Sequence, residues 1–288
     1  MSQNEVQKDT SNLKRTIVAD SCCELNEELK KRTDLKHVPF PITLNGVEYQ
    51  DDGSINISDF VREISRSPEI PKTAGPSPSL FLEAIGEAFE AFVVTISSKL
   101  SGTFSNARVA AAEIMETTQQ RIHVFDSKSA SGGETALAMK VQEWVDNNLP
   151  FEEIVEKGEA FIAHLKTYFV LEDLGTMVKS GRIPRLAGGI ANKLSIKPIC
   201  GSDDGKIRVV ELKRGLTKAL SRMVDIVAAS FDDFSDRILY ITHINNEERA
   251  VNIRDQIMER ANFKEAHILT GGGLSTVYAN NGGIIIAF

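Results

Sequence analysis

The sequence has no long apolar run, no excess of positive charge and few cysteines. Each of these absences excludes a class of protein. No apolar run approaches the roughly 18 residues that a membrane-spanning helix needs, so stable membrane insertion is not expected. The 288 residues include 33 basic and 40 acidic side chains, a net charge of −7, with no lysine- or arginine-rich stripe. Because nucleic-acid binding depends on neutralising phosphates, nucleic acid is not expected as a partner.

The three cysteines, Cys22, Cys23 and Cys200, make no disulfide framework, because two are adjacent in sequence and one is left over. No C-x-x-C or histidine-rich spacing typical of a metal site is present, so no metal is expected. This cysteine usage favours a reducing cytoplasm. Residues 1–14 are polar, lack the apolar centre of a secretion signal, and are predicted to form a disordered tail.

Familiar catalytic and cofactor motifs are missing as well. The chain has no G-x-x-x-x-G-K-[ST] phosphate loop, no G-x-S-x-G nucleophile turn, and no G-x-G-x-x-G after its first predicted strand. ATP binding through a phosphate loop is therefore not expected, and hydrolase and dehydrogenase functions lose most of their support. No cofactor is predicted.

Short runs rich in valine and isoleucine alternate with amphipathic stretches, a pattern typical of an α/β fold. Buried strands are predicted at residues 15–19, 92–96, 122–125, 238–242, 267–269 and 284–288. Hairpins are predicted at Asn45–Gly46 and Asp203–Gly205. We expect two tightly packed α/β domains with largely parallel sheets, 15–149 with a hairpin insertion and 150–288, and a ligand site at their junction.

Turns rich in hydroxyl groups and glycine follow several of these strands. They span residues 20–21, 97–103 and 126–133, and a similar turn at 73–77 precedes a helical pattern. Hydroxyls and free backbone N–H groups at helix N-termini stabilise a carboxylate or a phosphate. Each turn alone is weak evidence, because serine and threonine also cap ordinary helices. Parallel strands bring such turns to one edge of a sheet, where together they favour an anion site.

The same segments, in the same order, resemble the DegV family of bacterial fatty-acid-binding proteins. The resemblance runs from Thr16 to Phe288, and S-S-x-L-S-G-T with K-S-G-R-I are its most specific pieces. The matching motifs are VADS, K-T-A-G-P-S-P, I-S-S-K-L-S-G-T-F, F-D-S-K-S-A-S-G-G, L-x-x-L-x-x-x-x-K-S-G-R-I, S-I-K-P-I-C and E-L-K-R-G-x-x-K-A.

This resemblance implies a non-catalytic protein that holds one long-chain fatty acid in a closed tunnel between its domains. It also implies that the protein presents the carboxylate to a separate fatty acid kinase. Thr73 and Ser101 are expected to bind the carboxylate, with Ser97 and Ser98 as neighbours. Arg182 is expected to order the polar rim. The resemblance further assigns Arg214 to the surface that docks the kinase.

Each of these residues also has a simpler interpretation. Thr73 starts a turn before Pro76, Ser101 caps a helix, Arg182 ends a helix, and Arg214 is solvated. Three other features are expected to be structural: the aspartates at strand ends as caps of their own turns, a buried histidine, and a glycine-rich turn that offers a weaker anion nest. They are Asp20, Asp126, His243 and Gly271–Gly273.

The resemblance fails at one position that bears on function. Tyr278 stands where the family usually carries a histidine in a glycine-rich turn before the last strand. A phenol hydrogen-bonds but carries no positive charge near neutral pH. Two rival functions therefore stay open: a lipid-sensing module that no kinase uses, and a small-molecule phosphotransferase or hydrolase that uses the hydroxyl-rich rim.

Overall fold

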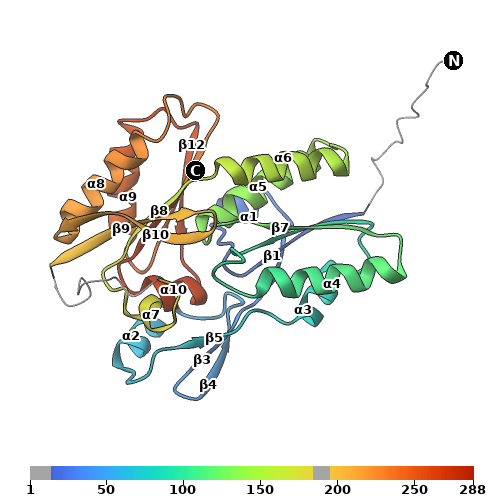
Figure 1. Ribbon diagram of the computed structural model, residues 1–288, viewed down its shortest axis with the longest axis horizontal. Coiled ribbons are helices and arrows are strands. Elements are labelled where there is room, and N and C mark those ends of the chain that lie inside the picture. Colours follow the sequence, from blue (N-terminus) through green and yellow to red (C-terminus); the bar gives the residue numbers. More distant parts are fainter. Residues whose placement is uncertain (1–13, 184–194) are drawn as a thin grey trace.

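A four-stranded parallel sheet forms from the valine- and isoleucine-rich runs of the first half of the chain (Figure 1). The structure is a computed structural model that describes residues 14–183 and 195–288, so the predicted tail, apart from Lys14, lies outside it. Because both faces of a parallel sheet are covered, every residue of the strand at 90–95 is buried. The strand order is β2 (Lys36–Val38), β1 (Arg15–Asp20), β6 (Glu90–Thr95) and β7 (Arg121–Asp126).

Two pairs of helices cover this sheet, and one helix is shared with a second sheet. In Figure 1, α3 (Pro78–Ile85) and α4 (Thr103–Thr117) lie on one face, with α5 (Gly132–Asp146) and α6 (Phe151–His164) on the other. The α5 helix is buried over nearly its whole first half because its opposite side packs against the second sheet. A Cβ at Gly132 would lie 3.1 Å from the Cβ of Tyr240, so glycine suits this close approach of the helix to the second sheet.

The second sheet is mixed, and the prediction of largely parallel sheets is wrong for it. Only β11 and β12 pair in parallel, and the other pairs are antiparallel. The helix α10 (Gly273–Ala279) has seven residues and spans about 10 Å, too little to return the chain to the start of the sheet. The chain therefore enters its last strand in the opposite direction. The order is β10 (Lys206–Arg214), β9 (Ile196–Asp203), β8 (Thr167–Val170), β13 (Ile284–Ala287), β11 (Ile238–His243), β12 (Glu265–Thr270).

The outer face of the second sheet is covered by α8 (Leu216–Ala228) and α9 (Glu247–Met258), whose apolar side chains form a core with β8, β11 and β13. Both predicted hairpins are confirmed. Asn45 and Gly46 have φ of 50° and 79°, and Asp204 and Gly205 have φ of 47° and 82°. Positive φ at both central residues gives the turn the twist that antiparallel strands need.

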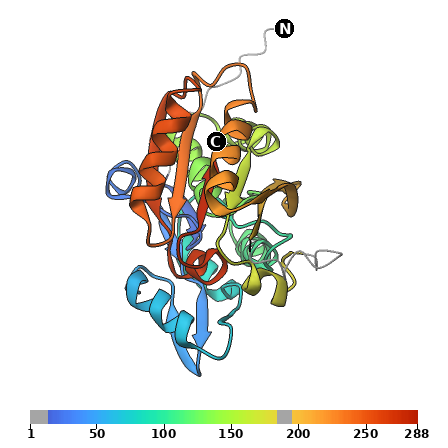
Figure 2. The same ribbon diagram turned by 90° about the vertical axis from the view of Figure 1, so that its left-hand side faces the viewer.

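The first hairpin, β3 (Pro41–Leu44) with β4 (Val47–Gln50), pairs with β5 (Lys72–Thr73) in a small third sheet. Figure 2 shows this sheet and α2 (Ile57–Arg66), both in blue, below the two larger sheets, with α10 in red above them. Asn56 caps α2, because its side chain accepts a hydrogen bond from the Asp59 N–H. The short helices are α1 (Glu27–Lys30) and α7 (Gly175–Lys179).

The division of the chain into domains at Leu149–Pro150 stays a prediction. The helix that follows this step, α6, packs on the first sheet: Ile154 and Ile162 share a core with Ile17 and Phe92. The chain enters the second sheet only at β8.

The position of α6 leads to a stability prediction. Replacing the fully buried Ile154 with alanine should lower the free energy of unfolding by about 2–5 kcal/mol, because it removes buried methyl groups and leaves a cavity. Val109→Ala on α4 is the matched control, since that side chain is 55% exposed. Urea unfolding measures both. Equal, small changes in the two variants would contradict the packing of α6 in this core.

Candidate functional site

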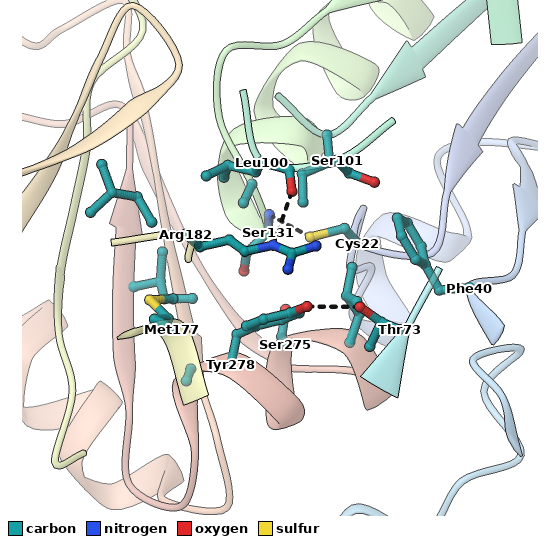
Figure 3. A pocket seen from close by; sticks show the side chains of 16 residues that line it. Cys22, Phe40, Thr73, Leu100, Ser101, Ser131, Met177, Arg182, Ser275 and Tyr278 are labelled. Atoms are coloured by element: carbon teal, nitrogen blue, oxygen red, sulfur yellow. Dashed lines mark hydrogen bonds between the residues drawn. The ribbon is translucent and has the colours of Figure 1, made fainter. Parts of the chain in front are cut away.

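An elongated cavity lies where the turns after β1 and β6 meet α10 and the second sheet (Figure 3). The space between its walls is about 570 Å³, a volume that includes space open to solvent. Most of its wall is apolar, contributed by several elements of both halves of the chain. The apolar lining residues are Phe40, Ile96, Leu100, Ala130, Met177, Ile207, Leu274, Ala279 and Ile285.

Five hydroxyl-bearing side chains line this cavity, and three of them, Thr73, Ser101 and Tyr278, were predicted. Thr73 lies on β5, Ser101 precedes α4, and Tyr278 lies on α10. The Thr73 Oγ1 and Tyr278 Oη atoms are 2.7 Å apart, as the dashed line in Figure 3 shows. The Ser101 Oγ atom lies 2.8 Å from the Thr103 Oγ1 atom. The fold thus brings together side chains from three distant segments.

Arg182, also predicted, follows α7 and extends across the cavity in Figure 3. Its Nε donates to the carbonyl of Leu100 at 3.3 Å, and its Nη1 donates to the carbonyl of Ser180 at 2.8 Å. The guanidinium lies 5.7 Å from the centre of the Tyr278 ring. It is the only charged group among the described lining residues, and no described carboxylate pairs with it. It is therefore available to an anion in the cavity.

Three other predicted residues lie away from the cavity wall. The buried Ser97 hydroxyl donates to the carbonyl of Gly205 at 2.8 Å and so joins the first sheet to the β9–β10 hairpin. Ser98 donates to Asp126 through both its N–H and its hydroxyl. Arg214 is exposed at the end of β10. None of the three lines the cavity.

Two carboxylates lie directly behind the polar wall and accept hydrogen bonds from groups of both halves of the chain. Glu24 accepts hydrogen bonds from the hydroxyls of Ser131 and Thr242 and, at 3.2 Å, from the Gly272 N–H. Asp51 accepts from the N–H groups of Gly273 and Leu274 at 2.6 and 2.9 Å. The glycine-rich turn at 271–273 is thus an anion nest, and it is filled by the protein's own carboxylates.

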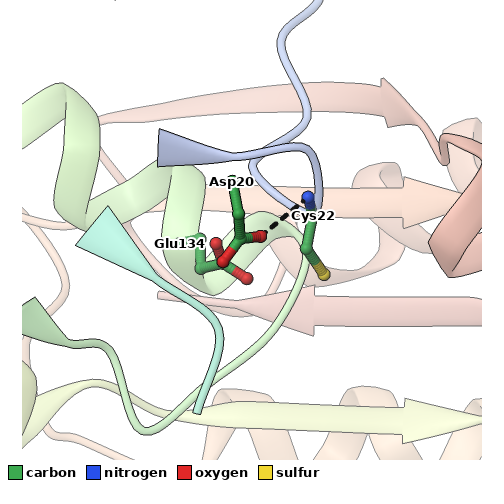
Figure 4. Close-up of side chains that lie close together, drawn as sticks. All are labelled: Asp20, Cys22 and Glu134. Atoms are coloured by element: carbon green, nitrogen blue, oxygen red, sulfur yellow. Dashed lines mark hydrogen bonds between the residues drawn. The ribbon is translucent and has the colours of Figure 1, made fainter. Parts of the chain in front are cut away.

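A second carboxyl pair lies beside Glu24 (Figure 4). Asp20 accepts from the N–H groups of Cys22 and Ile96, at 3.0 and 2.8 Å, which confirms its predicted role as a cap. Glu134, on α5, is fully buried, and neither of its carboxyl oxygens receives a hydrogen bond from a described N–H or O–H donor. Its carboxyl group faces Asp20. Ionisation of both carboxyl groups at once is therefore disfavoured by their mutual repulsion.

Burial is the largest cause of the shifted pKa values of these groups. It raises the pKa of Asp20 to about 6 and that of Glu24 to about 7. Burial and the neighbouring charge of Asp20 raise the pKa of Glu134 well above its ordinary range. Burial also raises the pKa of the Cys22 thiol, so this sulfur stays protonated. Donor atoms of Asp20, Cys22 and Glu134 lie within 4.8 Å of one another, but a metal ion binds the thiolate, whereas burial keeps the Cys22 thiol protonated.

The sequence analysis did not identify Glu24, Glu134, Ser131 or Ser275 as part of the site. Ser131 and Ser275 line the cavity, and the two glutamates lie behind it. One signal was available for Glu134: it is the only carboxylate in the otherwise uncharged start of α5. No pattern in the sequence indicates that Ser275 points into the cavity.

Comparison with known proteins identifies the family. The family model described as "Uncharacterised protein, DegV family" matches residues 14–288. A DegV domain-containing protein of Streptococcus pyogenes serotype M3 is 30% identical over 278 residues, which cover 94% of this chain and 98% of that protein. The chain belongs to the DegV family.

Solved DegV structures share the whole fold of this DegV protein. A DegV family protein from Ruminococcus gnavus, refined with vaccenic acid, has a TM-score of 0.91 and 39% identity, covering 96% of this chain and all (100%) of that one. One from Eubacterium eligens, loaded with heptadecanoic acid, has a TM-score of 0.86 and 28% identity, covering 95% and 98%. The Fatty Acid Kinase (Fak) B3 protein of Streptococcus pneumoniae, loaded with linoleic acid, has a TM-score of 0.86 and 28% identity, covering 96% and 99%.

These comparisons confirm the recognised family and the α/β fold of the DegV chain. They also show that DegV structures bind fatty acids. No helix within residues 14–183 and 195–288 of the DegV chain is long and apolar enough to cross a membrane.

The buried Glu24 gives the DegV protein a testable pH dependence. Its pKa is raised from 4.5 to about 7, so the folded protein holds this proton more tightly than the unfolded chain. Its contribution to the free energy of unfolding is therefore fully present below about pH 4.5 and is lost as the pH rises to 7 and above. At 1.36 kcal/mol for each pKa unit, the loss is about 3 kcal/mol.

Glu24→Gln stays neutral, so its stability relative to the native protein should rise by this amount between about pH 4.5 and 8. Urea unfolding of both proteins at each pH measures the difference. Taking the difference cancels the histidines with lowered pKa, His37, His243 and His267, which titrate in both proteins. A difference that is constant over this pH range would contradict the burial of an ionisable Glu24.

Proposed function

We propose that this protein binds one long-chain fatty acid in the cavity, with the acyl chain against the apolar wall and the carboxylate at Thr73, Ser101, Tyr278 and Arg182. The observation that carries the proposal is the arrangement of the wall: the hydroxyls of Thr73, Ser101 and Tyr278 and the one charged group among the described lining residues lie in a largely apolar cavity. The fatty acids bound by the relatives from Ruminococcus gnavus, Eubacterium eligens and Streptococcus pneumoniae support it.

The energetics assign different tasks to the two ends of the ligand. Burial of an acyl chain contributes about 0.8 kcal/mol for each methylene, so the chain supplies most of the affinity. Removing a carboxylate from water costs several kcal/mol, which charge-assisted hydrogen bonds must offset. Hydroxyls at three points and a guanidinium supply such bonds, and their fixed positions orient the carboxylate.

A second step of the proposal concerns the use of the bound lipid. The protein itself is non-catalytic and cytoplasmic, and it presents the carboxylate to a fatty acid kinase. The Streptococcus pneumoniae relative is named Fatty Acid Kinase (Fak) B3 protein, and this name supports the partnership. Arg214 is proposed as part of the docking surface, and its exposure at the end of β10 is compatible with this role.

The tyrosine at position 278 favours an alternative function, in which the protein binds the same ligand as a lipid sensor. Its hydroxyl bonds to Thr73, so it takes part in the polar end of the cavity as a neutral group. A protein that binds the fatty acid but does not support phosphoryl transfer would act as a lipid sensor. The two uses share the cavity and differ only in what the kinase does with the bound carboxylate.

The hydroxyl of Ser101 provides a direct test of the carboxylate position. Ser101→Ala should weaken the binding of a long-chain fatty acid by about 1–3 kcal/mol, because it leaves a buried carboxylate without one donor. Ser105→Ala is the matched control, since Ser105 is exposed on the following helix. Isothermal titration calorimetry measures both. Unchanged affinity in Ser101→Ala would reduce this residue to a helix cap.

A substitution at position 278 tests whether fatty acid binding and phosphoryl transfer to the fatty acid depend on different groups. Tyr278→His should raise acyl-phosphate formation with a fatty acid kinase and ATP, because imidazole can carry a positive charge and a proton near neutral pH. The affinity for the fatty acid should stay nearly the same. Parallel assays of binding and acyl-phosphate yield check this. A change in affinity as large as the change in yield would contradict the separation of the two roles.

A further inference from the structure

The wall of the cavity is backed by an unusual concentration of buried acid. Asp20, Glu24 and Glu134 are each at most 6% exposed. Glu24 contacts the cavity wall through Ser131, whose hydroxyl donates to it. Asp20 contacts the wall through Cys22, whose N–H donates to it. We call these three residues the carboxyl cluster.

No cation compensates the carboxyl cluster within the described residues. Its described hydrogen-bond donors are hydroxyls and backbone N–H groups, and no lysine, arginine or histidine forms an ion pair with any of its members. The ionisable groups that face it add no positive charge: the thiols of Cys22 and Cys23 on its own segment, and Asp51 near α10. Two bases lie in the surroundings: Arg182 on the cavity wall, and His37, which faces Asp51 and whose Nε2 lies 2.8 Å from the carbonyl oxygen of Cys23.

We propose that fatty acid binding is coupled to proton uptake by the carboxyl cluster, so that affinity falls as the pH rises through neutrality. The inference rests on the proposed function, because it requires a ligand whose head is an anion. A carboxylate in the cavity adds negative charge next to buried acids in a region of low dielectric constant. The complex relieves this repulsion by protonating a member of the cluster.

The acidities of the cluster place the effect near physiological pH. The pKa values of about 6 for Asp20 and about 7 for Glu24 mean that the unliganded cluster loses protons between these values. The ligand anion raises both further, so around pH 7 to 8 the complex holds more protons than the free protein. Linkage then requires affinity to fall with rising pH, by at most about tenfold per pH unit for each proton taken up. Below about pH 6 the affinity levels off.

The test measures the dissociation constant of vaccenic acid, below its aggregation concentration, from about pH 6 to 9. In the native protein the constant should rise at least about threefold between pH 6.5 and 8.5. In Glu24→Gln, which cannot ionise, this rise should be at most half as large on a logarithmic scale. The corresponding fatty alcohol has no charge, so its binding should be independent of pH in both proteins.

Calorimetry in buffers of different ionisation enthalpy provides a direct count of protons taken up, which should be smaller in Glu24→Gln. If that variant does not fold, Thr242→Val serves instead. It removes one donor to ionised Glu24, so the fall in affinity should shift to higher pH. In the native protein, the infrared absorption of protonated carboxyl groups should also grow on binding at about pH 7.5.

Two results would overturn the proposal. One is binding of vaccenic acid with the same pH dependence in the native protein and in the variant. The other is proton uptake of zero in every buffer while binding is intact. A failure to bind any fatty acid at any pH is a different outcome, because it overturns the proposed function and this inference together.

Discussion

Buried hydrogen bonds across the seam between the two halves of the molecule hold the cavity in place. The ends of the parallel strands carry polar groups that cannot reach water, so each must find a partner within the protein, and several find one in the other half. Glu24 takes donors from α5, β11 and the turn before α10, Asp51 takes the first N–H groups of α10, and Ser97 donates to the β9–β10 hairpin. These bonds position three of the elements that form the cavity wall. The wall therefore depends on acceptors that lie outside the cavity itself.

This arrangement brings several negative charges into the same small region. The acids that join the halves are buried and mutually repulsive, and the proposed ligand brings a further negative charge. Protons on Glu134 and its neighbours reduce the repulsion within the protein, and Arg182 supplies the one positive charge on the described cavity wall. The acyl chain does not take part in this balance, because its contribution comes from the removal of apolar surface from water. Different parts of the site thus interact with the charge of the ligand and with its acyl chain.

Local patterns in the sequence predicted the elements whose causes are local. The strands at 15–20 and 90–95 follow from β-branched apolar runs, and the hairpins at 45–46 and 204–205 follow from residues that accept positive φ. The direction of β13 was not predictable in this way, because it depends on how far the short α10 can carry the chain.

The site was predictable only in part for the same reason. Thr73, Ser101, Arg182 and Tyr278 were expected from motifs that resemble the DegV family, and all four line the cavity. Ser97, from the same motif as Ser101, points instead to Gly205. Glu24 and Glu134 belong to no such motif, and apart from the position of Glu134 in the uncharged start of α5, only tertiary packing distinguishes these buried acids from exposed ones.

The measurement that tests the central claim most directly is mass spectrometry of an organic extract of the freshly purified protein. The account predicts a long-chain fatty acid in an amount close to one molecule per chain, which would also name the acyl group. An extract without fatty acid, together with failure of the protein to bind added fatty acids, would contradict it. The fold would then be that of the family with a different ligand in the cavity.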